Sequence, residues 1–190
     1  MKELIASFTA QIRQAIDIGN RAVFSSSSAP IQNVLITGLG GSGIGGSIIA
    51  QVVEKEIRVP VVVNKDYFIP NFVDANTLVI ASSYSGNTEE TIAAMEISLQ
   101  RGATVVCITS GGKILEMALA SGLDHIVIPG GMPPRACLAY SFTQLFFVLN
   151  GFGLIGDAFK EDLEAAIHLL DHEERSEEHT SELQSRGLIS

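Results

Sequence analysis

The sequence predicts an α/β protein built on a doubly wound, five-stranded parallel sheet with helices on both faces. Short apolar segments of strand length alternate along the chain with stretches of helical period, the pattern expected of a parallel sheet. The strand-like segments are largely apolar rather than alternating, which is typical of strands buried on both faces. With 190 residues, 46% of them hydrophobic, the chain has the length and apolar content for one such domain.

The N-terminal region is expected to be a helix followed by a loop. An apolar residue recurs every four positions and predicts a helix over residues 2–23. The residues of this stripe are Leu4, Phe8, Ile12 and Ile16. The polar stretch SSSSAP at residues 25–30 then interrupts the helical pattern.

The remaining elements follow in regular alternation. The expected strands lie at residues 33–37, 59–63, 77–81, 103–109 and 125–128. The expected helices run from the glycine-rich stretch 38–47 to about residue 55 and over residues 88–101, 113–120, 137–149 and 157–170. Gly102 directly follows the helix at 88–101, and Gly122 comes two residues after the helix at 113–120; glycine is common at helix C-termini.

Charge and composition exclude several classes of partner. A net charge of −9 argues against nucleic acid, which requires a basic surface. No apolar run approaches the roughly 18 residues of a membrane helix, and the N-terminus lacks the pattern of a signal peptide. Cys107 and Cys137 lie in apolar surroundings without metal-ligand spacing, so we expect buried free thiols and no metal site. These features predict a cytoplasmic protein.

A hydroxyl-rich stretch, SSYSGNTEET at residues 82–91, joins the third expected strand to the next helix. It carries Ser83, Ser85 and Thr88 where the first N–H groups of a helix have no internal partners and the helix dipole is positive. Such a position suits a phosphate. The simpler alternative is N-terminal capping, but a cap requires one hydroxyl and three are present.

A glycine-rich stretch follows the first expected strand in the same way. The sequence GLGGSG at residues 38–43 fits a dinucleotide-binding fingerprint. The expected acidic partner is poorly placed, because Asp66 lies beyond the end of the second strand, so a dinucleotide-binding oxidoreductase remains an alternative. A P-loop is excluded, since Ile44 stands where its lysine would be.

The two stretches meet if the strands take the flavodoxin-like order 2-1-3-4-5. Strands one and three are then neighbours, and a topological switch point lies between their carboxyl ends. Two helix N-termini and four hydroxyl groups would converge on one crevice, which suits a phosphomonoester better than a dinucleotide. The four hydroxyl residues are Ser42, Ser83, Ser85 and Thr88.

The glycine-rich stretch together with the pattern SxSGNTxET resembles the sugar isomerase (SIS) domain family. In addition, GGMPPRACLAYSF at residues 130–142 is similar to the PxR motif of bifunctional phosphoglucose/phosphomannose isomerases. The resemblance implies homodimers of two-domain chains that interconvert glucose or mannose 6-phosphate with fructose 6-phosphate, without a cofactor or metal. It implies Arg135 as a catalytic residue that reaches the substrate. The residues that it implies for phosphate binding are Gly41, Ser42, Ser83, Ser85 and Thr88.

Arg135 also has a simpler interpretation. It follows two prolines and is expected at the N-terminus of the helix that begins near Ala136, where the helix dipole disfavours a cation. An exposed arginine without a role in the reaction is therefore the alternative.

The same resemblance sets the expected domain organisation. We expect an N-terminal helix and linker at residues 1–30, the SIS domain at 31–156 and the start of an inter-domain helix at 157–172. Residues 175–185 (RSEEHTSELQS) resemble a translated sequencing adapter, which makes 173–190 an expected non-native tail.

The catalytic groups of the family are expected outside this sequence. The family's base and ring-opening residues would lie in a second SIS domain, so this chain alone is expected to be inactive. Glu89 and Glu90 are acids in the first turn of a helix, where they are commonplace and need no catalytic role. A sugar-phosphate-sensing domain of a regulator remains a further alternative.

Overall fold

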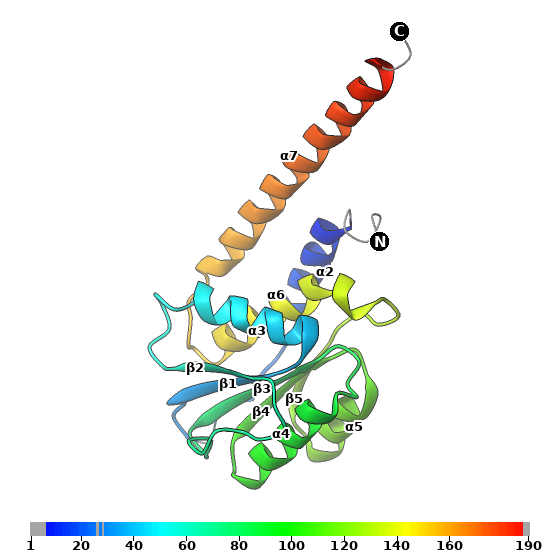
Figure 1. Ribbon diagram of the computed structural model, residues 1–190. Helices are drawn as coiled ribbons and strands as arrows, with labels where there is room; N and C mark the ends of the chain where they lie inside the picture. Colours follow the sequence, from blue (N-terminus) through cyan, green and yellow to red (C-terminus); the bar gives the residue numbers. More distant parts are fainter. Residues whose placement is uncertain (1–6, 26, 28, 188–190) are drawn as a thin grey trace.

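Five parallel strands form one sheet in the order β2–β1–β3–β4–β5 (Figure 1). The structure, a computed structural model, describes residues 7–25, 27 and 29–187. The strands are β1 (Asn33–Thr37), β2 (Val61–Asn64), β3 (Thr77–Ser83), β4 (Thr104–Thr109) and β5 (Asp124–Val127). Each neighbouring pair is parallel, so the expected fold class and strand order are confirmed.

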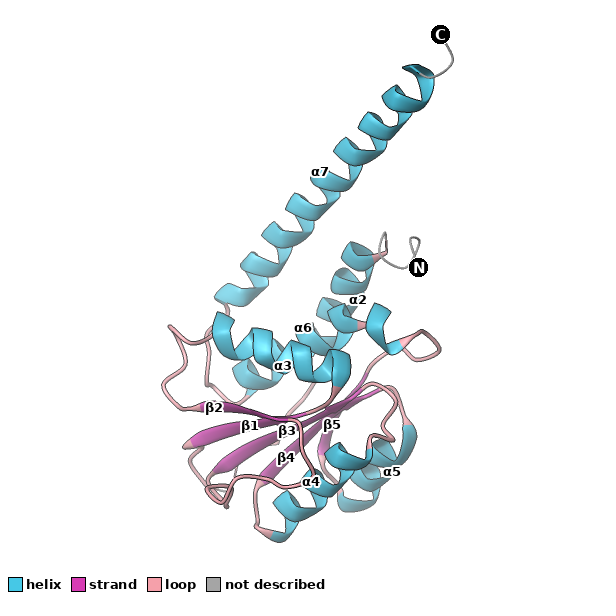
Figure 2. Cartoon of the chain, in the orientation of Figure 1, coloured by secondary structure: helices cyan, strands magenta, loops and turns pink. Residues whose placement is uncertain are grey.

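Helices cover both faces of the sheet, as expected (Figure 2). On one face lie α3 (Gly40–Val52) and α6 (Leu138–Gly151), with α2 (Phe8–Asn20) packed on α6. On the other face lie α4 (Glu89–Gln100) and α5 (Gly112–Ser121). The long helix α7 (Ala158–Gly187) contacts α2 and then extends away from the sheet (Figure 1).

The alternation of side chains along each strand divides the core into two layers. In β3, Leu78 and Ile80 pack with α3 and α6, whereas Val79 and Ala81 pack on the α4 side. All seven residues of β3 are buried, because this strand is central and covered on both faces. The apolar strands of the sequence therefore reflect two-sided burial.

Element boundaries differ from the sequence-based expectation at several ends. The first helix begins at Phe8 and ends at Asn20, and residues 2–6 lie outside the described part of the chain. Strand β2 begins at Val61 rather than residue 59, after Pro60, which has no N–H group for the ladder. Thr88 is the N-cap of α4 rather than its first residue.

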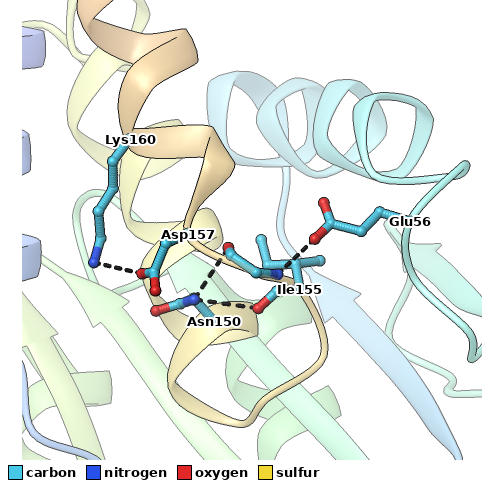
Figure 3. A network of polar contacts seen from close by, with 6 residues as sticks. Glu56, Asn150, Ile155, Asp157 and Lys160 are labelled. Carbon is cyan, nitrogen blue, oxygen red and sulfur yellow. Dashed lines mark hydrogen bonds and ion pairs between the residues drawn. The ribbon is translucent and has the colours of Figure 1, made fainter.

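The turn between α6 and α7 is fixed by a network of polar contacts (Figure 3). The Asn150 side-chain amide donates to the carbonyl oxygens of Ile155 and Gly156, both at 3.1 Å. The carboxylate of Glu56, which follows α3, accepts the N–H of Gly156, and Lys160 Nζ lies 2.7 Å from Asp157 Oδ1. These contacts determine where α7 starts. Helix α7 then continues through the expected non-native tail, and this helical backbone does not bear on the origin of that stretch.

Candidate phosphate-binding site

A pocket of about 210 Å³ opens where the carboxyl ends of β1 and β3 lie side by side. It is smaller than the roughly 300–1,000 Å³ of pockets for drug-sized ligands. Four residues proposed from the sequence line it together: Gly41, Ser42, Ser85 and Thr88. The other lining residues are Leu39, Gly40, Tyr84, Pro134, Cys137 and Ser141.

Glycines allow the β1–α3 loop to lie close to the end of β3. A Cβ atom added to Gly38 would lie 2.6 Å from the carbonyl oxygen of Ser82, and one added to Gly43 would lie 2.5 Å from the carbonyl oxygen of Gly38. A side chain at either position would force the loop away from the sheet. The loop instead brings the N-terminus of α3 to the pocket, where N–H groups and the helix dipole favour an anion.

The hydroxyl groups of the β3–α4 loop do not serve as caps of α4. Thr88 is the N-cap residue, yet its side chain makes no capping hydrogen bond. Its hydroxyl lies 2.8 Å from the Ser83 hydroxyl, which also accepts the N–H of Gly86 at 3.2 Å. The Ser85 hydroxyl accepts the N–H of Asn87 at 3.3 Å. The capping alternative therefore does not account for these three side chains.

The neighbouring β4–α5 loop holds the β3–α4 loop in place. Gly86, with φ of +68°, accepts the N–H of Ile114 at 2.9 Å, and Asn87 Oδ1 accepts the N–H of Lys113 at 3.0 Å. A Cβ added to Gly86 would lie 1.7 Å from the carbonyl oxygen of Gly111. The loop is thus held by hydrogen bonds and close contacts from the neighbouring β4–α5 loop.

Two of the residues proposed from the sequence lie outside the pocket lining. Ser83 is buried behind Thr88 and reaches the pocket through their hydroxyl contact. Arg135 is exposed on a short 3-10 turn, η1 (Pro134–Ala136), next to Pro134 at the pocket. Because α6 begins only at Leu138, Arg135 lies before the helix and not at its N-terminus. The expected conflict with the helix dipole is thereby reduced.

Sequence reasoning did not identify Tyr84, Cys137 or Ser141 as pocket residues. Tyr84 lies within the hydroxyl-rich stretch, and its phenol oxygen accepts the N–H of Met132 at 3.1 Å. Burial, and secondly an interaction with Cys137, raise the pKa of Tyr84, while the Met132 N–H acts in the opposite direction. A contact between residues 48 positions apart has no local signal in one sequence.

The pocket lining contains no carboxylate and no histidine. Glu89 and Glu90 stand in the first turn of α4 outside it, and Glu89 Oε2 accepts the Tyr67 hydroxyl at 3.3 Å. Over residues 7–25, 27 and 29–172 no group of three potential metal ligands is found. Both cysteines are free and buried, as expected, and burial raises the pKa of Cys107 to about 12.

The fold and the pocket define a doubly wound α/β domain with an anion-binding crevice at its topological switch point. Residues 29–128 match the SIS domain family, and the chain belongs to this family. A bifunctional phosphoglucose/phosphomannose isomerase of Caldicellulosiruptor bescii is 43% identical over 170 residues, which cover 90% of this chain and 50% of that protein. A protein of the same name from Thermoplasma acidophilum is 51% identical over 108 residues, covering 57% of this chain and 33% of the relative.

Solved structures support the same fold. The C-terminal domain of glucosamine-fructose-6-phosphate aminotransferase from Francisella tularensis superposes with a TM-score of 0.62 at 18% identity. The match covers 90% of this chain and 52% of that one. The chain spans about half the length, or less, of the relatives named above. In the part of the chain that the structure describes, no helix has the length and apolar character needed to cross a membrane.

Proposed function

We propose that this domain anchors the phosphate of hexose 6-phosphates in an aldose–ketose isomerase. The reaction would interconvert glucose 6-phosphate or mannose 6-phosphate with fructose 6-phosphate. Gly41, Ser42, Ser85 and Thr88 would hold the phosphate, with Ser83 orienting Thr88 and Arg135 reaching the sugar. The names of the relatives support this choice of substrate.

One observation carries the proposal: two helix N-termini and several hydroxyl groups face the same small pocket. Buried Ser42 lines it, and no hydrogen-bond partner for its hydroxyl is found among the described residues, so it can donate to a ligand. Backbone N–H groups and hydroxyls together provide the donors that a phosphate dianion requires. Such local donors are needed because the chain carries a net charge of −9.

The anchor would contribute orientation rather than proton transfer. Isomerisation removes a proton next to a carbonyl group and returns it one carbon away, which requires a base in contact with both carbons. The pocket lining offers no carboxylate or imidazole for this step. Binding energy from the unreactive phosphate can instead hold the sugar in the geometry for attack by groups supplied from elsewhere. We place the base and the ring-opening groups in a second SIS domain.

Calorimetry on the 190-residue chain tests the anchor. We expect glucose 6-phosphate and fructose 6-phosphate to bind and to compete with inorganic phosphate. Glucose without phosphate should bind at least about 100-fold more weakly, because two or more charge-assisted hydrogen bonds are lost. Equal affinity for glucose and glucose 6-phosphate would contradict the proposal. Enhancement of NADH fluorescence would favour the dinucleotide alternative instead.

We further propose residues 31–156 as the SIS domain, residues 157–172 as the start of an inter-domain helix and residues 173–190 as a non-native tail. The full-length protein would be a cytoplasmic homodimer. The two free, buried thiols are consistent with a reducing compartment. Sequencing the uninterrupted gene tests the tail, and sedimentation of its product tests the dimer.

A further inference from the structure

Segment 129–136, which carries Arg135, lies between two buried residues, and its Pro134 lines the pocket. Before it, the N–H of buried Ile128 donates to the carbonyl oxygen of Thr109 at 2.9 Å, and after it Cys137 is 1% exposed. Within the described residues, one hydrogen bond joins this segment to a distant part of the chain. It runs from the Met132 N–H to the Tyr84 phenol oxygen, at 3.1 Å.

The backbone of Tyr84 is itself held in place by hydrogen bonds. Its carbonyl oxygen accepts the N–H of Ser110 at 3.0 Å and the Ser110 hydroxyl at 2.6 Å. Its side chain is half-buried and lines the pocket. The backbone of Tyr84 is thus hydrogen-bonded to the β4–α5 loop, while its hydroxyl accepts a hydrogen bond from segment 129–136.

Gly131 precedes a turn that is held together by its own hydrogen bonds. Gly131 has φ of +85° with open space around it, a conformation that glycine adopts without strain. Beyond it, the Cys137 thiol donates to the carbonyl oxygen of Pro133 at 3.3 Å, and the N–H of Ala136 donates to the same oxygen at 2.8 Å. The Met132–Tyr84 hydrogen bond therefore fixes the orientation of this turn together with the packing of Met132 on the core and the contact of η1 with α3.

The exposed Arg135 depends on this turn for its position. Its side chain makes no hydrogen bond or ion pair with another residue in the described ranges. Next to it, Pro134 lies close to the first turn of α3, because a Cβ added to Gly41 would lie 3.5 Å from the Pro134 carbonyl oxygen. Where the turn sits against the pocket thus decides where the guanidinium group can reach.

We propose that Tyr84 is a positioning residue whose hydroxyl latches the Pro133-Pro134-Arg135 turn over the pocket and thereby directs Arg135 to the sugar. The latch itself follows from the contacts above. The part played by Arg135 in binding a sugar phosphate rests on the proposed function, so the two are tested separately.

Thiol labelling of the 190-residue chain tests the latch without any ligand. Tyr84→Phe removes the acceptor, and Met132→Pro removes the donor from the other side of the same hydrogen bond. Each should accelerate modification of Cys137 by a disulfide reagent by about 3- to 10-fold, since one hydrogen bond no longer opposes opening. Cys107, on the opposite face of the sheet, should stay protected.

Tyr140→Phe is the matched control. It removes the hydroxyl of buried Tyr140, which donates to Gln14 Oε1 at 2.6 Å on the α2 side. Labelling of Cys137 should remain near the wild-type rate in this variant. The proposal is overturned by unchanged rates in both latch variants, or by faster labelling of both cysteines in all three variants, which indicates general unfolding.

A double-mutant cycle tests the link to Arg135. Affinities for glucose 6-phosphate and for inorganic phosphate are measured by calorimetry for the wild type, Tyr84→Phe, Arg135→Gln and the double variant. Tyr84→Phe should weaken glucose 6-phosphate binding about 3- to 10-fold, weaken inorganic phosphate binding less, and have no further effect on glucose 6-phosphate binding when it is added to Arg135→Gln. Additive effects overturn the positioning role. Absence of sugar-phosphate binding in the wild type overturns the proposed function and, with it, the role of Arg135, while labelling still decides the latch.

Discussion

Two adjacent buried serines at the end of β3 differ in whether their hydroxyl groups have a partner. Ser82 is fully buried, and no partner for its hydroxyl is found in the described part of the chain. Ser83, one position further, is paired with the Thr88 hydroxyl. Successive side chains of a strand point to opposite faces, so the difference follows from strand geometry rather than from residue type. Ser82 can therefore serve as a control position for substitutions of the pocket hydroxyls.

Removing a pocket hydroxyl should weaken ligand binding without unfolding the domain. We expect Ser85→Ala and Thr88→Val each to reduce the affinity for glucose 6-phosphate by about 1–3 kcal/mol, because a hydrogen bond to a charged group is lost. Ser82→Ala is the control, and it should leave binding unchanged. Calorimetry measures the three affinities. If both pocket variants bind as tightly as Ser82→Ala, the hydroxyls do not contact the phosphate.

Cys107 should make the stability of the domain depend on alkaline pH. Burial raises the pKa of this thiol from 9.0 to about 12, so the folded state holds its proton more tightly than the unfolded state does. The stabilisation is complete below pH 9 and is lost as pH rises from 9 to 12, by at most about 1.4 kcal/mol per pH unit. As the pH rises above 9, the free energy of unfolding of the wild type should therefore fall relative to that of Cys107→Ala.

Denaturant unfolding at pH 8, 9 and 10 measures that increment. Val106→Ala is the control, since it also shortens a buried side chain of β4 but removes no titratable group. Its destabilisation should be the same at each pH. A pH-independent difference between the wild type and Cys107→Ala would show that the thiol keeps an ordinary pKa when folded.

At the scale of elements, the sequence was sufficient for order and type but not for long-range contacts. Apolar runs and helical periods predicted the five strands and the helices between them, because two-sided burial imposes those patterns. The observed ends of elements differ from the predicted ones where a local feature acts, as at Pro60, after which β2 begins. The hydroxyls of the pocket were predictable from their place after β3, whereas the contact of Tyr84 with Met132 depends on how distant loops pack.

Gly86 should be among the most sensitive positions of the β3–α4 loop. Gly86→Ala meets both a left-handed backbone, φ +68°, and the carbonyl oxygen of Gly111 at 1.7 Å. Gly153→Ala is the matched control, with φ of +69° but no atom within 4 Å of the added Cβ. The control should cost about 1–2 kcal/mol from backbone strain alone.

Gly86→Ala should therefore cost at least about 2 kcal/mol more than Gly153→Ala, or displace the loop and lower phosphate affinity instead. Denaturant midpoints and calorimetry distinguish the two outcomes. Equal stability of the two variants, together with normal phosphate binding, would mean that the loops do not lie as close as the structure describes.

For the molecule as a whole, the net charge is negative, whereas the proposed site is suited to an anion. The chain has a net charge of −9, which repels anions at long range, yet its pocket collects the N-termini of α3 and α4 and several hydroxyls. Anion binding must then depend on short-range donors at the switch point rather than on a positive surface field. This arrangement favours recognition of one small phosphorylated ligand over binding to a polyanion.

The 190-residue chain should bind hexose phosphates without isomerising them. The pocket lining includes no carboxylate and no histidine, and the chain spans about half of its Caldicellulosiruptor bescii relative. Positioned acid and base groups typically contribute roughly 10²–10⁴-fold each, so an anchor without them provides orientation alone. A coupled assay for conversion of fructose 6-phosphate to glucose 6-phosphate should detect no turnover with this chain. A chimera that adds the unmatched half of that relative should be active, and Ser85→Ala should lower its activity. Turnover by the short chain alone would require a base among the residues described here.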